Sequence, residues 1–306
     1  MVYGNSLERM IVNFLRDIGD IRCLSGRLMP LLACAMILSA CATQTTTSFE
    51  PPALDHTEPA VEVVDVDVLA VSPDMEEFLE RYILPYRNKH TRLTLLMNAV
   101  SANGVLGFSY NDTLTLTSVD AFDQRTGNCL GFANKVIALA RKAGLKAYYQ
   151  EVFRRREWSS REETVLLVKH VNVILETGAY TYVMDASGLN YSPSARRRII
   201  DDGYAKALYL NNIGAESLIE KDLPTAHAYM SRAIMIEPQL ADSWVNLGVV
   251  LGRNGQLDDA ATAFRTALEI DSFEYSAVGN LYEVYLAQGD QKSADELEAK
   301  VERYRR

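Results

Sequence analysis

The chain has 306 residues, 48% of them hydrophobic and 23% charged, which predicts about two globular domains and excludes collagen, coiled coil or disorder as the main architecture. The net charge of -9 argues against general nucleic-acid binding, because phosphate contacts need clustered basic residues. Four cysteines, with no CxxC pair among them, are too few for a disulfide scaffold and do not form a thiolate zinc site.

Residues 1–40 are predicted to be a bacterial lipoprotein signal peptide. Two arginines precede an apolar run from Leu28 to Leu38, which is far shorter than the ~20 residues of a membrane-spanning helix. The run ends Leu-Ser-Ala-Cys and resembles a lipobox, which implies cleavage before Cys41 and lipid on that cysteine. Ala42 in the next position points to the outer membrane more than the inner. We therefore expect a lipid-anchored cell-envelope protein whose one free thiol is Cys129.

The next two stretches are predicted to be a linker and an α+β domain. Residues 41–75 are acidic and lack Lys and Arg, as in a flexible linker, although the valines between residues 61 and 71 alternate and could pair as a strand. Residues 76–206 combine helical and strand-like patterns. The helical patterns cover residues 75–86, 89–102 and 129–143, and the strand patterns cover residues 146–153, 165–175 and 180–185. A helix followed by a meander of strands is typical of an α+β fold.

Residues 207–306 repeat with a period of 34, in repeats that begin at 207, 241 and 275. Small residues recur at matching positions, such as Gly214 and Gly248, as close helix crossings require. Trp244-x-x-Leu247-Gly248 resembles the core of a tetratricopeptide repeat. This resemblance implies paired antiparallel helices with a concave face for a protein or peptide partner, and we expect them to dock on the 76–206 domain. The residues expected to be exposed on that face are Asn211, Ala215, Asp242, Val249, Arg253, Gly279 and Glu283.

The candidate catalytic residues are Cys129, His170 and Asp185. Cys129 is predicted at the first turn of a helix, where amide donors and the helix dipole favour a thiolate. His170 lies within one predicted strand and Asp185 ends the next, so imidazole and carboxylate could lie side by side on neighbouring strands. In such an arrangement the cysteine attacks, the histidine takes its proton and the aspartate orients the ring.

Four motifs surround these residues, namely Arg125-x-Gly127-x-Cys129-x-x-Phe132-Ala133, Ala140-Arg141-x-Ala143-Gly144-Leu145-x-Ala147, His170-Val171-Asn172-Val173 and Tyr182-Val183-Met184-Asp185-Ala186. These motifs resemble those of the transglutaminase-like superfamily. The resemblance covers about residues 76–200 and implies a papain-like thiol fold that performs acyl transfer, in a bacterial branch often followed by tetratricopeptide repeats. Its members include cross-linkers, proteases, amidases and inactive scaffolds. Asn172 stands where many relatives carry an aromatic residue.

Other features complete the expected site. Gln124 is a candidate side-chain donor to an oxyanion, beside the backbone amide of Cys129. The four histidines are dispersed along the chain, so we expect neither a metal nor a cofactor. Two runs of three arginines, at residues 154–156 and 196–198, could attract an acidic peptidoglycan stem peptide.

Two alternatives remain open. Papain itself is excluded by spacing, because papain-type enzymes place the histidine about 130 residues or more after the cysteine, whereas here His170 follows Cys129 closely. An NlpC-like peptidoglycan endopeptidase fits the spacing, but those proteins usually read Asp-Cys-Ser, and this chain reads Asn-Cys-Leu. A non-catalytic envelope scaffold, in which only the repeats bind partners, belongs to a different class of function.

Overall fold

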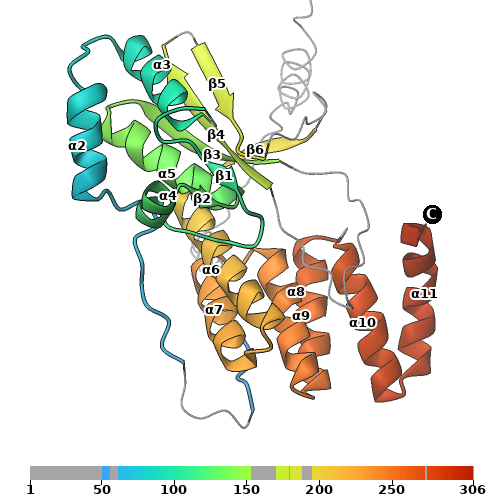
Figure 1. Ribbon diagram of the computed structural model, residues 1–306. Helices are drawn as coiled ribbons and strands as arrows, with labels where there is room; N and C mark the ends of the chain where they lie inside the picture. The colour runs from blue at the N-terminus through green and yellow to red at the C-terminus, as the bar shows by residue number, and fades with distance from the viewer. Residues whose placement is uncertain are drawn as a thin grey trace, which may run out of the picture. The chain divides into compact units, whose positions relative to one another are not determined.

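The computed structural model describes residues 50–55, 61–101, 103–152, 170–178, 180–187, 195–272 and 274–305. The predicted signal peptide, Cys41 and the first residues of the strand predicted at 165–175 lie outside these ranges. The described chain forms an α+β region with a four-stranded antiparallel sheet, followed by a run of packed helices (Figure 1). None of the helices described is both long and apolar enough to span a membrane.

In the described residues, four helices and a small parallel pair of strands precede the sheet. The helices are α2 (Pro73–Tyr82), α3 (Lys89–Val100), α4 (Ser118–Gln124) and α5 (Cys129–Lys142), and β1 (Ser109–Tyr110) pairs with β2 (Thr126–Gly127). Each helix begins where a Ser, Thr or Asn side chain accepts a hydrogen bond from an amide of the first turn, which satisfies a donor that the helix itself leaves unpaired. Helix α2 ends at Tyr82, before the predicted residue 86, because Pro85 disfavours a helical conformation of the residues that precede it.

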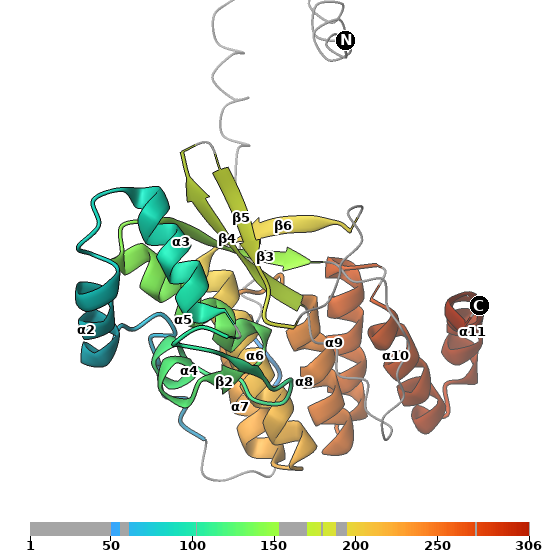
Figure 2. The ribbon, with the colours of Figure 1, turned by 45° about the horizontal axis from the view of Figure 1, so that its top comes forward.

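The main sheet contains β3 (Lys146–Val152), β4 (His170–Thr177), β5 (Tyr180–Met184) and β6 (Arg197–Ile200). Its strand order is β5-β4-β3-β6, and every neighbouring pair is antiparallel (Figure 2). The strands predicted at 146–153 and 180–185 are confirmed to within one residue at their ends. Helix α5 packs against β3 and β4, and α3 packs against β4.

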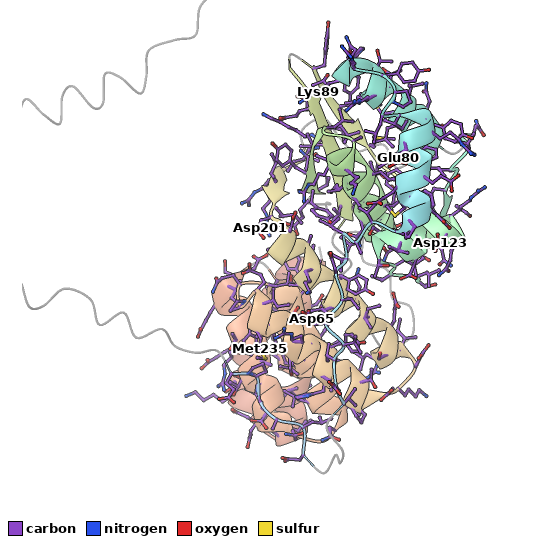
Figure 3. All side chains as sticks on the ribbon, turned by 90° about the vertical axis from the view of Figure 1, so that its left-hand side faces the viewer. Asp65, Glu80, Lys89, Asp123, Asp201 and Met235 are labelled. Carbon is purple, nitrogen blue, oxygen red and sulfur yellow. The ribbon has the colours of Figure 1, made fainter. Side chains whose placement is uncertain are left out.

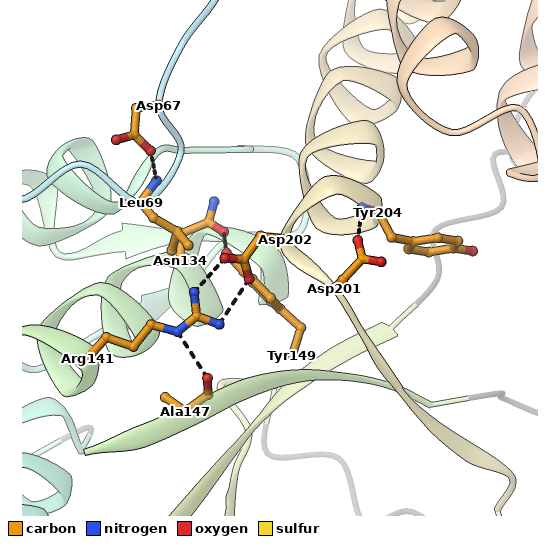
Figure 4. Close-up of polar contacts among 9 residues, drawn as sticks. All are labelled: Asp67, Leu69, Asn134, Arg141, Ala147, Tyr149, Asp201, Asp202 and Tyr204. Atoms are coloured by element: carbon orange, nitrogen blue, oxygen red, sulfur yellow. Dashed lines mark hydrogen bonds and ion pairs between the residues drawn. The ribbon is translucent and has the colours of Figure 1, made fainter. Parts of the chain in front are cut away.

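Helix α5 forms the centre of the α+β core. Every residue from Cys129 to Ala140 is buried, so this helix is surrounded on all sides rather than amphipathic. Its apolar side chains pack with those of Tyr149, Val173 and Leu175 from the sheet. The Tyr149 hydroxyl donates to Asn134 Oδ1 at 2.6 Å (Figure 4), which pairs two buried polar groups.

The linker prediction is wrong for residues 61–72, which pack along the protein instead of standing away from it. Val68 is only 5% exposed, and Val63 and Val66 lie against the same core. The amide of Ser118 donates to Val68 O at 2.9 Å, and Lys206 pairs with Asp65, which is labelled in Figure 3, at 2.5 Å. The alternating valines therefore bury apolar surface, but this stretch does not form a strand.

The helical run contains three consecutive helix pairs. They are α6 (Asp202–Ile219) with α7 (Leu223–Ile236), α8 (Ala241–Arg253) with α9 (Leu257–Ile270), and α10 (Tyr275–Gln288) with α11 (Gln291–Arg305). The second helices of the pairs begin at 223, 257 and 291, so the predicted period of 34 is confirmed. A Cβ on Gly248 would lie 2.6 Å from Cε1 of Phe264, which explains why a residue without a side chain occurs at this helix crossing.

The boundary predicted at residue 206 falls inside α6, which begins at Asp202. The first turns of α6 contribute Tyr204 and Leu208 to the core of the α+β region, so the expected docking is confirmed but the two regions share a core at the junction. Arg141 of α5 donates to both carboxylate oxygens of Asp202, at 2.6 and 2.9 Å, and to Ala147 O (Figure 4). Helix α6 is therefore an element of both regions.

The exposure expected for the concave face is wrong for Asn211, Ala215 and Asp242, which are buried. Asn211 Oδ1 accepts hydrogen bonds from Ser243 Oγ and Asn246 Nδ2, both at 3.1 Å, so this polar side chain joins α6 to α8 rather than facing a ligand. Arg253 and Glu283 are exposed as expected. A 34-residue period locates these positions on a helix face, but it does not reveal which of them bond to the next helix.

Candidate active site

Cys129 is held by a strained turn followed by a capped helix. Arg125 has a φ of 55° and Gly127 a φ of 138°, and the latter is a backbone conformation that residues with a side chain rarely adopt. Asn128 then caps α5, because its Oδ1 accepts from the amides of Leu130 and Gly131 at 3.1 and 3.0 Å. The thiol therefore lies in the first turn of a helix, where the dipole favours a negative charge.

The cap residue is itself anchored from the preceding loop. Asn128 Nδ2 donates to Thr115 Oγ1 at 2.7 Å, and its amide donates to Leu114 O at 2.8 Å. The amide of Thr115 in turn donates to Glu216 Oε1 at 3.0 Å, and Glu216 belongs to α6. The position of the cysteine thus depends on contacts that extend to the helical run.

His170 and Asp185 come from neighbouring strands. His170 is the first residue of β4, where it pairs with Val152 of β3, and it is 3% exposed. Asp185 directly follows β5. The two side chains meet through His170 Nε2 and Asp185 Oδ2 at 2.6 Å. The carboxylate keeps its position because its other oxygen, Oδ1, accepts from the amide and the hydroxyl of Ser187 at 2.8 and 2.6 Å.

The electrostatics of the pair favour an imidazolium beside a carboxylate. Burial of His170 favours the neutral ring, but the hydrogen bonds and charges of Asp185 and Cys129 outweigh it and raise the pKa of His170 to about 9. Burial of Asp185 favours its neutral form, but the hydrogen bonds from His170 and Ser187 dominate and lower the pKa of Asp185. The ring is therefore protonated at neutral pH, with the carboxylate on one side and a hydrogen bond with Cys129.

The structure thus brings Cys129, His170 and Asp185 together, although they come from a helix and two strands that are separated in sequence. It does not add Gln124 to this group. Gln124 is exposed at the end of α4, and in the described ranges no hydrogen bond joins its side chain to the other three residues. Cys129 is 2% exposed, so little of its surface is open to solvent.

Sequence reasoning did not find Ser187 and Thr115, which support this group, or the burial of Lys135. Lys135 of α5 is fully buried, its Nζ lies 4.4 Å from the ring centroid of Phe108, and it donates to Leu106 O at 3.3 Å. Burial, together with the charge of Arg125, lowers the pKa of Lys135 to about 8. A lysine inside a helical pattern normally indicates the solvent face, and the neighbouring Asn134 is polar as well, so the sequence pattern does not indicate that Lys135 is buried.

In the part of the chain that the structure describes, no cluster of three or more His, Cys, Asp and Glu side chains is arranged to hold a metal ion. No protein-family model matches the chain, and no curated protein matches it.

Proposed function

We propose that the α+β region is a transglutaminase-like domain that performs acyl transfer through the thiol of Cys129. The observation that carries this proposal is the bond of 2.6 Å between His170 and Asp185, combined with a hydrogen bond between His170 and a cysteine at a helix N-terminus. A nucleophile, a base within hydrogen-bond reach and a third group that orients the base are the parts that nucleophilic catalysis needs.

The chemistry proceeds in two halves. With the thiol proton already transferred to His170, the Cys129 sulfur forms a bond to the carbonyl carbon of a substrate amide, and the carbon–nitrogen bond breaks as the resulting imidazolium gives its proton to the leaving nitrogen. The products of this half are a thioester and an amine or ammonia. His170, now neutral, takes a proton from water or an acceptor amine that attacks the thioester, and the thiolate leaves. Asp185 keeps the ring oriented throughout.

The remaining parts of the proposal concern recruitment and location. The helical run from α6 to α11 would be a tetratricopeptide-repeat array that recruits a protein or peptide partner, as its 34-residue period suggests. The lipobox-like sequence before Cys41 supports attachment to the cell envelope. Lipid chains together with additional signals give stable anchoring, whereas a single chain binds only marginally.

One observation favours a second function, that of a non-catalytic scaffold. Cys129 is 2% exposed and lies in the hydrophobic core, as inert structural cysteines often do. In a scaffold, the helical run would bind partners while the cysteine served only for packing. The two functions differ in whether Cys129 is chemically required.

The test is release of ammonia from a protected glutamine dipeptide, benzyloxycarbonyl-Gln-Gly, by the full chain. We expect Cys129→Ala to reduce turnover by about 10³-fold or more, while the matched variant His90→Ala, at an exposed histidine of α3, retains the activity of the unmodified protein. Turnover that survives in Cys129→Ala would contradict the acyl-transfer proposal, and absence of turnover in the unmodified protein would favour the scaffold.

A further inference from the structure

Two amide side chains next to the candidate site have oxygen atoms without a hydrogen-bond partner among the described residues. These atoms are Asn172 Oδ1 and Gln150 Oε1, and both are buried. Asn172 is 2% exposed, so its oxygen cannot be satisfied by bulk water. Because buried polar groups are normally paired, two orphaned acceptors in neighbouring positions need an explanation.

These acceptors are cross-strand neighbours. Gln150 of β3 pairs directly with Asn172 of β4 in the antiparallel register, and directly opposed residues share one face of a sheet with their Cβ atoms about 5 Å apart. His170 lies two residues before Asn172 on the same strand, so its side chain leaves the strand on the same face.

The other candidate residue is aligned with the same row. The last pair between β4 and β5 joins Val173 to Met184, so the next step of the register places Asp185 beside Asn172. A row of polar residues therefore crosses the sheet from Gln150 through Asn172 to Asp185, with His170 adjacent to it. The orphaned oxygens therefore lie on the same face of the sheet as His170 and in one row with Asp185.

We propose that Asn172 and Gln150 are specificity-determining residues whose side-chain oxygens accept hydrogen bonds from the N–H groups of the substrate. This inference rests on the proposed acyl transfer. Carbonyl oxygens have no proton to give, so they match a donor such as an amide nitrogen and not the oxygen of an ester. The stability lost by leaving two acceptors unpaired in the free protein is recovered when an amide substrate binds.

The experiment compares two probes, benzyloxycarbonyl-Gln-Gly and the matched dipeptide in which a γ-methyl ester replaces the glutamine side-chain amide. Full-length protein is compared with Asn172→Leu and Gln150→Met, which remove the acceptor and roughly keep its volume. Each variant is expected to lower kcat/KM for the amide about 5- to 10-fold, the usual effect of one lost hydrogen bond. Ester turnover, which also reports that the variants fold, is expected to change less than about 2-fold. Asn98→Leu, at an exposed position of α3, is the matched control and should alter neither rate.

The outcomes separate this inference from the proposed function. Selective loss of amide turnover supports it. An equal loss on both probes, or no loss on either, overturns the role of the two amides while the acyl-transfer proposal stands. If the unmodified protein shows no turnover of either probe that depends on Cys129, the proposed function fails and this inference fails with it.

Discussion

In the helical run, each helix packs mainly on the helices next to it in sequence, whereas the α+β region joins elements that are distant in the chain. The core of the helical run is formed by small and apolar residues that recur every 34 positions, such as Ala226 and Ala260. The core of the α+β region includes polar or ionisable groups, namely Cys129, Lys135, Glu151, His170 and Asn172.

This difference in buried groups indicates which region is suited to catalysis. The helical run also buries polar side chains such as Asn211, Asp242 and Glu274, but Asn211 there joins one helix pair to the next, as contacts between adjacent repeats do. Burying ionisable groups costs stability unless they are paired, and the α+β region pairs His170 with Asp185 and fixes Asp185 with Ser187. Buried ionisable groups with shifted pKa values cluster at functional sites, so we propose that the catalytic residues lie in the α+β region.

The largest expected effect concerns the residue that orients the imidazole. Asp185→Ala should lower kcat/KM on the glutamine dipeptide by about 100-fold, less than removal of Cys129, because the thiol and the ring both remain. Without the carboxylate the pKa of His170 falls from about 9, so the alkaline limb of the pH–rate profile should move to lower pH. A profile of kcat/KM between pH 5 and 10 measures both effects. An unchanged alkaline limb would show that Asp185 does not act through His170.

The next effect tests the local packing of the helical run. Gly248→Ala places a Cβ 2.6 Å from the ring of Phe264, and since that ring is 2% exposed and cannot easily move, we expect a loss of about 1–3 kcal/mol in the free energy of unfolding. The control is Gly279→Ala in α10, where the new methyl group meets nothing within 4 Å and should stabilise the helix by ~0.5–1 kcal/mol. Urea denaturation measures both variants, and equal effects would refute the close-packing explanation.

The smallest effect is the pH dependence of stability. The pKa of His170 is raised from 6.5 to about 9, so its contribution is fully present below pH 6.5 and is lost as the pH rises through about 9. The pKa of Asp185 is lowered from 3.8, so its contribution is present above that value and is lost at more acidic pH. Denaturation from pH 5 to 10 should therefore show a decrease on the alkaline side that His170→Gln removes. Parallel curves for the two proteins would contradict the charged pair.

The sequence predicted the parts of the fold that local patterns determine. The period of 34, helix α5 and two strands of the sheet were predicted close to their observed bounds, because each depends on residues near one another in the chain. The burial of Asn211 and Asp242 was not predicted, since a helical period does not show whether an exposed-looking polar residue bonds to the next helix.

The sequence predicts the candidate catalytic residues but not the hydrogen bonds that hold them in place. Cys129, His170 and Asp185 could be selected from their residue types and from the elements that carry them. The hydrogen bonds from Ser187 to Asp185 and the bond between Thr115 and Asn128 come from loops, where the sequence has no period that fixes side-chain direction. The strand register shows that Gln150 and Asn172 are cross-strand neighbours. Only the structure shows that, among the described residues, their side-chain oxygens have no hydrogen-bond partner.

The central claim, that Cys129 forms a covalent acyl intermediate, is tested most directly by intact mass spectrometry. The full chain is mixed with the γ-methyl ester dipeptide, and the reaction is quenched in acid within its first turnover. The account predicts a mass increase equal to one acyl group on Cys129, which is strongly reduced in His170→Ala and absent in Cys129→Ala. Turnover of the probe without any such adduct, or an adduct of equal yield in Cys129→Ala, would contradict it.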